Sequence, residues 1–249
     1  MNWLLRLFRS SVMVKIVMAV TGLGILGFLL AHLAANLLIF GGAEKINAYG
    51  QGLRDLGPLL WALRGGMLVC FGAHIWSAIV LADRNRTARP VGYKEKKSLK
   101  STLYSRTMMM SGLTVLAFVS FHLLHYTFGL IQPEHFGADY RLHNGRITHD
   151  VYSMVLYGFQ NPFYTIIYIL CMILVGWHLS HAVSSMFQTF GLNNPKYSGF
   201  LGKLGPAVAL IIVLAYLSIP TAVMIGVLKH EPANAQAALK TGEIKEMKR

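Results

Sequence analysis

Acidic residues are scarce in this chain of 249 residues, which has ten Asp and Glu against 23 Lys and Arg and a formal net charge of +13. Charged residues of both signs make up only 13% of the sequence, whereas 54% of it is hydrophobic. So small a charged share excludes an ordinary soluble domain and is typical of a polytopic membrane protein. We therefore attribute the excess of basic residues to membrane topology and expect no nucleic-acid partner.

Cysteine is also rare, with Cys70 and Cys171 both inside apolar segments. Two thiols cannot hold an iron–sulfur cluster, which needs about four. The chain has no C-x-x-C-H sequence for covalent haem attachment. The two cysteines are therefore read as small buried hydrophobic residues.

Long apolar segments dominate what is present, and each exceeds the roughly 20 residues needed to cross a bilayer. They predict an all-α membrane protein with five transmembrane helices in a single domain, residues 1–249. The first segment is too long for the apolar core of a signal peptide, about 7–15 residues, so we expect it to be retained. Pro58, Pro162 and Pro206 are expected in the first turns of the second, fourth and fifth helices. The predicted spans are about 12–40, 59–83, 103–131, 161–189 and 205–228.

Basic residues gather at the N-terminus and in the second and fourth connections. The positive-inside rule then places the N-terminus in the cytoplasm and the polar tail, residues 229–249, outside. The third connection, residues 132–160, is the longest and contains an amphipathic stretch that could lie on the outer surface as a lid.

Each of the first four apolar segments contains a histidine: His32, His74, His122 and His178. Ionisable residues at membrane depth are costly, usually face a bundle interior, and mark function. These four side chains are therefore the strongest candidates for a functional site.

Their depths can be estimated from the rise of an α-helix. His32 follows Lys15 by about 25 Å and His122 follows Arg106 by about 24 Å, which predicts one level in the outer half. His74 precedes Asp83 by about 14 Å and His178 precedes Gln188 by about 15 Å, which predicts a second level nearer the cytoplasm. The sequence thus predicts two pairs, His32 with His122 and His74 with His178, about 10 Å apart along the membrane normal.

A repeated offset accompanies two of the histidines. Thr21-Gly22 precedes His32 at the same spacing as Ser111-Gly112 precedes His122. Ten residues of helix span about 15 Å, which places each glycine near the level of the inner pair, His74 and His178. A flat macrocycle at that level would need close approach of the backbone, which glycine allows. The alternative is that Gly22 and Gly112 only allow tight helix packing.

Facing histidine pairs in an apolar bundle suit a haem iron held on both axial faces, whereas a zinc site would gather three or four ligands. Helix-packing or transport histidines remain the alternative. His125 and His181 lie three residues after His122 and His178, so on spacing alone either could replace its neighbour.

The chain resembles, over nearly its whole length, the dihaem cytochrome b (b558-type) membrane subunit of succinate:menaquinone oxidoreductases and quinol:fumarate reductases. The matching strings are AVTGLGILGFLLAHLAANLLIFGG, GAHIW, SGLTVLAFVSFHLLHYTFG and GWHLSHAVSSMFQTFGLN, one in each of the first four segments. The resemblance implies five helices, with one haem ligand in each of the first four. The resemblance implies that His122 and His178 are the haem ligands, and not His125 and His181. It also implies that His74 and His178 hold the haem nearer the cytoplasmic partner and that His32 and His122 hold the distal haem.

The resemblance further implies a flavoprotein subunit with covalently bound FAD and an iron–sulfur subunit, docked on the cytoplasmic side of a bacterial cytoplasmic membrane. The expected function is electron transfer between the iron–sulfur subunit and menaquinone through two haems b, in a complex that could form a higher oligomer. The chain itself would not oxidise succinate. The reverse direction, fumarate reduction, stays open.

Quinone-site residues are the least determined part of the resemblance. Glu44 and Asp55 are the acidic candidates near the outer end of the first span, while Arg54 and Arg64 could instead pair with a haem propionate. The rivals are a haem b subunit of another redox complex and, in a different class, a haem-free transporter or channel. A transporter is disfavoured because spans one to four have no central Asp or Glu.

Overall fold

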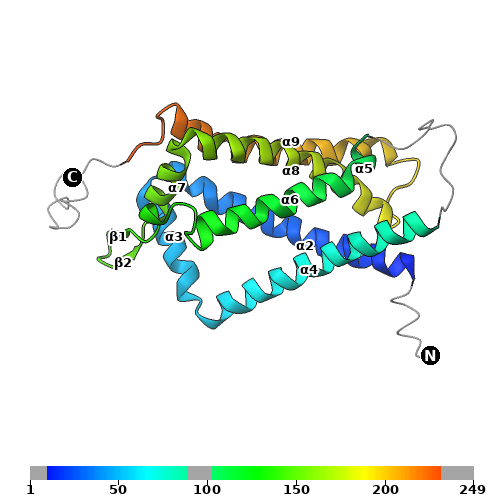
Figure 1. Ribbon diagram of the computed structural model, residues 1–249, viewed down its shortest axis with the longest axis horizontal. Coiled ribbons are helices and arrows are strands. Elements are labelled where there is room, and N and C mark those ends of the chain that lie inside the picture. The colour runs from blue at the N-terminus through cyan, green and yellow to red at the C-terminus, as the bar shows by residue number, and fades with distance from the viewer. Residues whose placement is uncertain (1–9, 89–102, 231–249) are drawn as a thin grey trace. The chain divides into compact units, whose positions relative to one another are not determined.

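The structure is a computed structural model that describes residues 10–88 and 103–230 (Figure 1). Within those residues, five helices are long and apolar enough to cross a membrane. These helices, with the short turns that extend two of them, are α2 (Ser11–Leu37) with η1 (Leu38–Gly41), α4 (Pro58–Thr87), α6 (Met108–His122) with the π-helical turn η2 (Leu123–Thr127), α8 (Pro162–Thr189) and α9 (Ser198–Met224). The prediction of five membrane-spanning helices is confirmed in length and composition.

Proline marks two helix starts as predicted, because Pro58 and Pro162 each occupy the first position of their helix. Asn161 completes the start of α8, where its side-chain oxygen accepts a hydrogen bond from the Phe163 amide at 3.0 Å. The predicted start of the fifth span, at about residue 205, was wrong. Helix α9 already begins at Ser198, so Pro206 lies inside it and not in its first turn.

The chain divides into two compact units, which are described separately. Unit 1 comprises Met1–Ala31, Trp61–Leu116 and Ile173–Val213, and unit 2 comprises His32–Leu60, Ala117–Met172 and Leu214–Arg249. In unit 1, α9 packs antiparallel to α8. A Cβ atom on Gly205 would overlap the Ser180 carbonyl, and the Ser184 hydroxyl donates to the Leu201 carbonyl at 3.1 Å. Helix α5 (Leu103–Arg106) also belongs to this unit.

Unit 2 contains a small polar region that we call the cap: α3 (Ala43–Asp55), the strands β1 (Asp139–Arg141) and β2 (Ile147–His149), and α7 (Val151–Gln160). The two strands pair antiparallel, with Tyr140 opposite Thr148. This hairpin was not foreseen by the all-α prediction. A short 3-10 turn, η3 (Pro133–His135), precedes it.

Asn47 connects the parts of the cap and is completely buried. Its amide donates to the Asp150 carboxylate at 3.0 Å, and its carbonyl oxygen accepts the Tyr152 amide at 3.1 Å. Asp150 also accepts the Ser153 amide at 3.0 Å, which makes it the N-cap of α7. The predicted amphipathic stretch is thus β2 followed by α7, and α7 buries most of its side chains, including Leu156.

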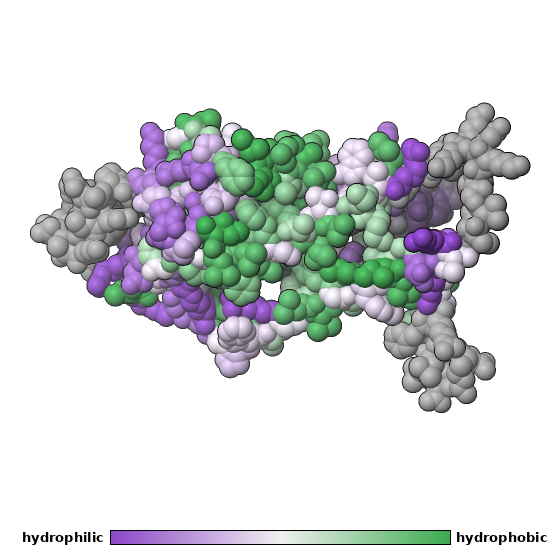
Figure 2. Space-filling model, in the orientation of Figure 1, coloured by the Kyte–Doolittle hydropathy of each residue, from purple (hydrophilic) through white to green (hydrophobic). Residues whose placement is uncertain are grey.

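Hydrophilic side chains gather over the cap, and hydrophobic ones cover the long helices (Figure 2). This distribution fits spans surrounded by lipid and a cap in contact with water. The tail from residue 231 and most of the second connection, residues 89–102, lie outside the described residues. The sidedness of the N-terminus and of the tail remains a prediction.

Candidate functional site

Unit 1 contains His74 on α4, beside the first half of α2. Its Nδ1 lies 3.1 Å from the Met18 carbonyl oxygen and 3.3 Å from the Thr21 hydroxyl oxygen. The Thr21 hydroxyl donates to the Val17 carbonyl at 2.7 Å, so its oxygen is an acceptor toward the imidazole. Both partners therefore favour the tautomer with the proton on Nδ1, which leaves the Nε2 lone pair available to a metal.

His178 on α8 has the same arrangement with respect to α6. Its Nδ1 lies 3.2 Å from the Ser111 hydroxyl oxygen, and that hydroxyl donates to the Met108 carbonyl at 3.0 Å. Ser111 is 6% exposed, so this contact is shielded from water. Nowhere in residues 10–88 and 103–230 does Nε2 of His74 or His178 have a hydrogen-bond partner.

The two glycines of the repeated motif lie against these same rings. A Cβ atom on Gly22 would be 3.2 Å from Cε1 of His74, and one on Gly112 would be 3.6 Å from Cε1 of His178. The structure thus brings each glycine next to a histidine of the pair that the sequence predicted. The hydroxyl residues Thr21 and Ser111 were missed as functional positions, although the repeated offset already included them.

Unit 2 contains the other two histidines, His32 on α2 and His122 at the end of α6. Their ring centroids are 5.8 Å apart and their planes are inclined by 82°. A metal between two imidazoles lies about 2 Å from each nitrogen, which puts the ring centroids about 6 Å apart. The observed separation is compatible with a metal held between the rings.

Aromatic rings surround this pair. Phe118, Tyr126 and Tyr168 have ring centroids 6.1, 5.9 and 6.1 Å from that of His122, and Tyr216 lies 6.3 Å from His32. Such surroundings are apolar apart from the phenol hydroxyls, so they exclude water and suit a planar apolar group.

His125, the alternative to His122, is only 3% exposed and has both ring nitrogens engaged. Nδ1 lies 3.2 Å from the Tyr168 hydroxyl, and Nε2 lies 2.8 Å from the Gln132 side-chain oxygen. Neither nitrogen is available to a metal in this arrangement. His181, the alternative to His178, makes no hydrogen bond to any part of the chain that the structure describes, and it lacks the hydroxyl support that His178 has.

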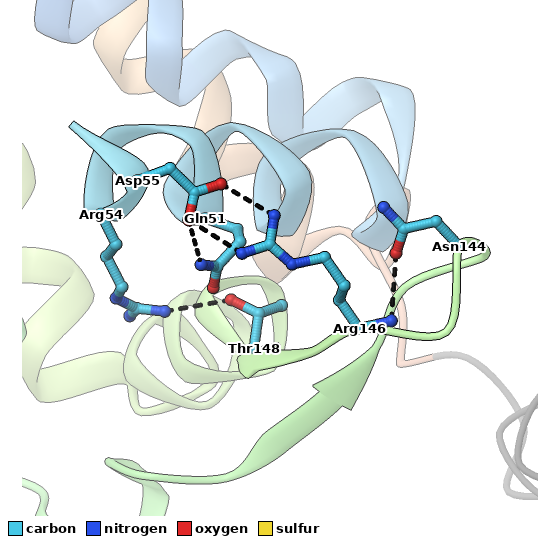
Figure 3. A network of polar contacts seen from close by, with 6 residues as sticks. All are labelled: Gln51, Arg54, Asp55, Asn144, Arg146 and Thr148. Atoms are coloured by element: carbon cyan, nitrogen blue, oxygen red, sulfur yellow. Dashed lines mark hydrogen bonds and ion pairs between the residues drawn. The ribbon is translucent and has the colours of Figure 1, made fainter. Parts of the chain in front are cut away.

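Asp55, one of the two acidic candidates, is fully engaged by the cap (Figure 3). Both of its oxygens accept hydrogen bonds from the Arg146 guanidinium at 2.8 Å, and one also accepts from Gln51 at 2.9 Å. The hydrogen bonds from Arg146 and then Gln51 lower the pKa of Asp55 to about 2. A carboxylate held so strongly in its charged form is poorly suited to proton transfer near neutral pH.

Glu44, the other candidate, lies in the first turn of α3 and is only partly engaged. Its Oε1 accepts the His143 amide at 3.0 Å and lies 3.8 Å from Nδ1 of that side chain. Its Oε2 is buried, with no hydrogen-bond partner in the described portion of the chain. A buried polar atom without a partner is an exception in folded proteins and a candidate contact for a ligand.

The two arginine candidates have other partners. Arg54 donates to the Thr148 hydroxyl at 3.0 Å, so it connects α3 to β2 (Figure 3). The Arg64 guanidinium lies over the ring of Trp61, 4.9 Å from its centroid.

Comparison of the chain with known proteins found no matching family model, no matching curated protein and no matching solved structure.

Proposed function

We propose that the chain is the membrane anchor and electron-transfer subunit of a succinate:menaquinone oxidoreductase, with two haems b held by pairs of histidines. His74 and His178 would hold one haem, and His32 and His122 the other. The observation that carries the proposal is the matched support of His74 and His178. Each has Nδ1 bound by a hydroxyl, with a glycine against the ring, so each offers Nε2 to a metal.

The residues present fit a haem better than an isolated ion. Haem iron needs only two side-chain ligands, one on each face, whereas a structural zinc site needs about four. The described residues contain no group of three or more His, Cys, Asp or Glu side chains that could hold an ion. The glycines also leave space beside the imidazoles that any larger side chain would fill.

Bound haem would supply a one-electron carrier suited to electron transfer. The chain's own residues fix the imidazole orientations and keep water away from the rings. Thr21 and Ser111 orient the rings of His74 and His178 by hydrogen bonds to Nδ1. The aromatic side chains around His122 hold its ring by packing and exclude water from it.

Glu44 is the better candidate for proton exchange with the quinone, because Asp55 is committed to Arg146. Glu44 follows η1, and Phe40 of η1 lines an open apolar groove of about 470 Å³ with Leu214, Leu217 and Thr221 of α9. A membrane-soluble quinone needs a proton-exchanging group close to an apolar surface that accepts its tail.

The remaining parts of the proposal follow the resemblance. Succinate oxidation would occur on a flavoprotein subunit, and electrons would arrive through an iron–sulfur subunit at the cytoplasmic side. The basic second connection is the expected docking segment, and most of it lies outside the described residues. The same architecture run in reverse would be a quinol:fumarate reductase.

The first test is a pyridine haemochrome assay on the purified chain, with a reduced-minus-oxidised visible spectrum. The expected result is two protohaems per chain, both low-spin in the ferric state. A colourless protein that is folded by circular dichroism would contradict the proposal and favour a haem-free transporter.

The second test concerns the assigned quinone residue. In the complex with its partner subunits, Glu44→Gln should lower quinone reduction while both haems stay bound. Asp55→Asn serves as the control with retained quinone reduction. The reverse pattern would move the proton-exchanging role to Asp55.

A further inference from the structure

Four polar side chains of unit 2 form a hydrogen-bonded chain that the proposed function does not use. The Tyr168 hydroxyl lies 3.4 Å from Nδ1 of His122 and 3.2 Å from Nδ1 of His125. Nε2 of His125 lies 2.8 Å from the Gln132 side-chain oxygen. The chain thus runs from His122 through Tyr168 and His125 to Gln132, and it connects α6, α8 and the start of the third connection.

Only one order of donors and acceptors satisfies every link when Nε2 of His122 binds iron. Nδ1 of His122 then carries the proton and donates to the Tyr168 oxygen. The Tyr168 hydroxyl proton must therefore go to Nδ1 of His125, and the Nε2 proton of His125 goes to Gln132. Tyr168 and His125 each accept one hydrogen bond and donate another, so the polarisation of each bond strengthens the next.

Burial holds this order in place. Tyr168 and His125 are 6% and 3% exposed, so water does not compete for their hydrogen bonds. The Tyr126 ring stacks on His125 at 4.0 Å with an angle of 19°, and Phe121 contacts His125 and Tyr168. His125 lies in the π-helical turn η2, a rare conformation that is frequent at functional sites.

We propose that Tyr168, held in place by His125 and Gln132, is a positioning residue that orients the His122 imidazole. Through this hydrogen bond it would tune the midpoint potential of the haem held by His32 and His122. This inference rests on the proposed function and adds a tuning mechanism to it. An acceptor at Nδ1 makes the imidazole a stronger electron donor and so favours ferric iron. Removing the acceptor should therefore raise the midpoint potential of that haem.

The test is a redox titration of Tyr168→Phe in the intact chain, followed by visible spectroscopy and by the ferric low-spin EPR signals. The midpoint potential of the haem on His32 and His122 should shift upward and its EPR signal should move. The potential and the signal of the other haem should stay as in the wild type. Unchanged values for both haems in a fully loaded variant would overturn the inference.

Tyr164→Phe is the matched control, because it makes the same chemical change one turn earlier on α8. Its ring lies 5.0 Å from that of His125, but its hydroxyl makes no hydrogen bond within residues 10–88 and 103–230. This variant should leave both potentials unchanged. An equal upward shift in Tyr164→Phe would show a packing effect and overturn the role of the hydroxyl.

His125→Leu supplies a second, independent variant in case Tyr168→Phe fails to load haem. It leaves Tyr168 in place and removes the group that accepts its proton, so a smaller upward shift of the same haem is expected. No shift would overturn the inference. A wild-type chain without haem would overturn the proposed function as well, whereas a loaded wild type with unresponsive variants would overturn only the tuning role.

Discussion

The two histidine sites are supported in different ways. In unit 1, His74 and His178 are each bound by a small hydroxyl residue that is itself bonded to its own helix backbone. In unit 2, His122 is bound by Tyr168, a large side chain that depends on further partners. The first kind of support is complete within one helix turn, and the second requires residues from several elements.

This difference has a physical consequence for robustness. A serine or threonine bonded to the preceding turn of its helix has few rotamers left, so its oxygen is placed by the helix itself. A tyrosine oxygen lies far from the backbone and needs packing and a proton acceptor to stay in place. We expect the unit 1 site to tolerate distant changes and the unit 2 site to be adjustable by them.

The largest effect should come from removing a ligand. His178→Ala is expected to lower the haem content from two to one per chain, with the spectrum of the remaining haem unchanged. His122→Ala should remove the other haem. Pyridine haemochrome and EPR distinguish the two cases, and His181→Ala is the control that should keep both haems. Loss of both haems from His178→Ala in a folded protein would show that the sites do not load independently.

The two glycines offer a sharper comparison. A Cβ atom on Gly112 would be at ordinary contact distance from His178, 3.6 Å, whereas one on Gly22 would be crowded against His74 at 3.2 Å. Alanine gains up to about 1 kcal/mol of helix propensity over glycine. Gly112→Ala should therefore be neutral or stabilising in thermal unfolding, and Gly22→Ala less favourable. Leucine at either position should reduce haem content, and retained content with leucine at both would remove the glycines from the site.

Removing the hydroxyl of Ser111 and removing that of Thr21 should affect haem retention to different extents. Among the described residues, Ser111 is the one hydrogen-bond partner of His178 Nδ1, whereas His74 keeps the Met18 carbonyl if Thr21 is lost. Loss of a group that orients a metal ligand typically costs about 10-fold to 100-fold in affinity. Ser111→Ala should approach that range in haem dissociation rate, and Thr21→Val should have a smaller effect. Thr21→Ser is the conservative control.

The smallest effect is expected at the pair of Asp55 and Arg146 in the cap. The pKa of Asp55 is lowered to about 2, chiefly by Arg146, so the contribution of this pair to stability is complete above about pH 4. It should be lost as the pH falls through about 2. Hydrogen exchange of the β1–β2 amides should then accelerate in the wild type more than in Asp55→Asn. Identical acid sensitivity in both would assign the effect to another carboxylate.

Apolar length was enough to predict the five long helices, because crossing a bilayer core requires about 20 mostly apolar residues. The start of the fifth helix was predicted too late because the residues from 198 to 205 include glycines and a lysine, which are typical of a loop. In the structure this segment is helical and packs on α8, where Gly205 lies against the Ser180 carbonyl. The cap could not be predicted, because Asn47 and Asp150 are 103 residues apart and nothing local specifies their contact.

The candidate site shows the same limit. Histidine spacing suggested the pairs, and the repeated Thr-Gly and Ser-Gly offset marked the parts of α2 and α6 that contact His74 and His178. The hydroxyl contacts join residues 53 and 67 positions apart, so their role emerged only from the structure. The engagement of both nitrogens of His125 is likewise a tertiary feature that spacing alone could not provide.

Gly158 gives the cap a mechanical connection to the His122 surroundings. The Tyr126 hydroxyl lies where a Cβ atom of residue 158 would be, and the Tyr126 ring stacks on His125. A methyl group added at residue 158 would overlap the Tyr126 hydroxyl and displace that ring. The displacement would also shift the His125 imidazole on which the Tyr126 ring stacks. Helix α7, which lies outside the spans, is thus coupled by direct contact to the surroundings of His122, and the missing side chain at Gly158 leaves the space that the Tyr126 hydroxyl occupies.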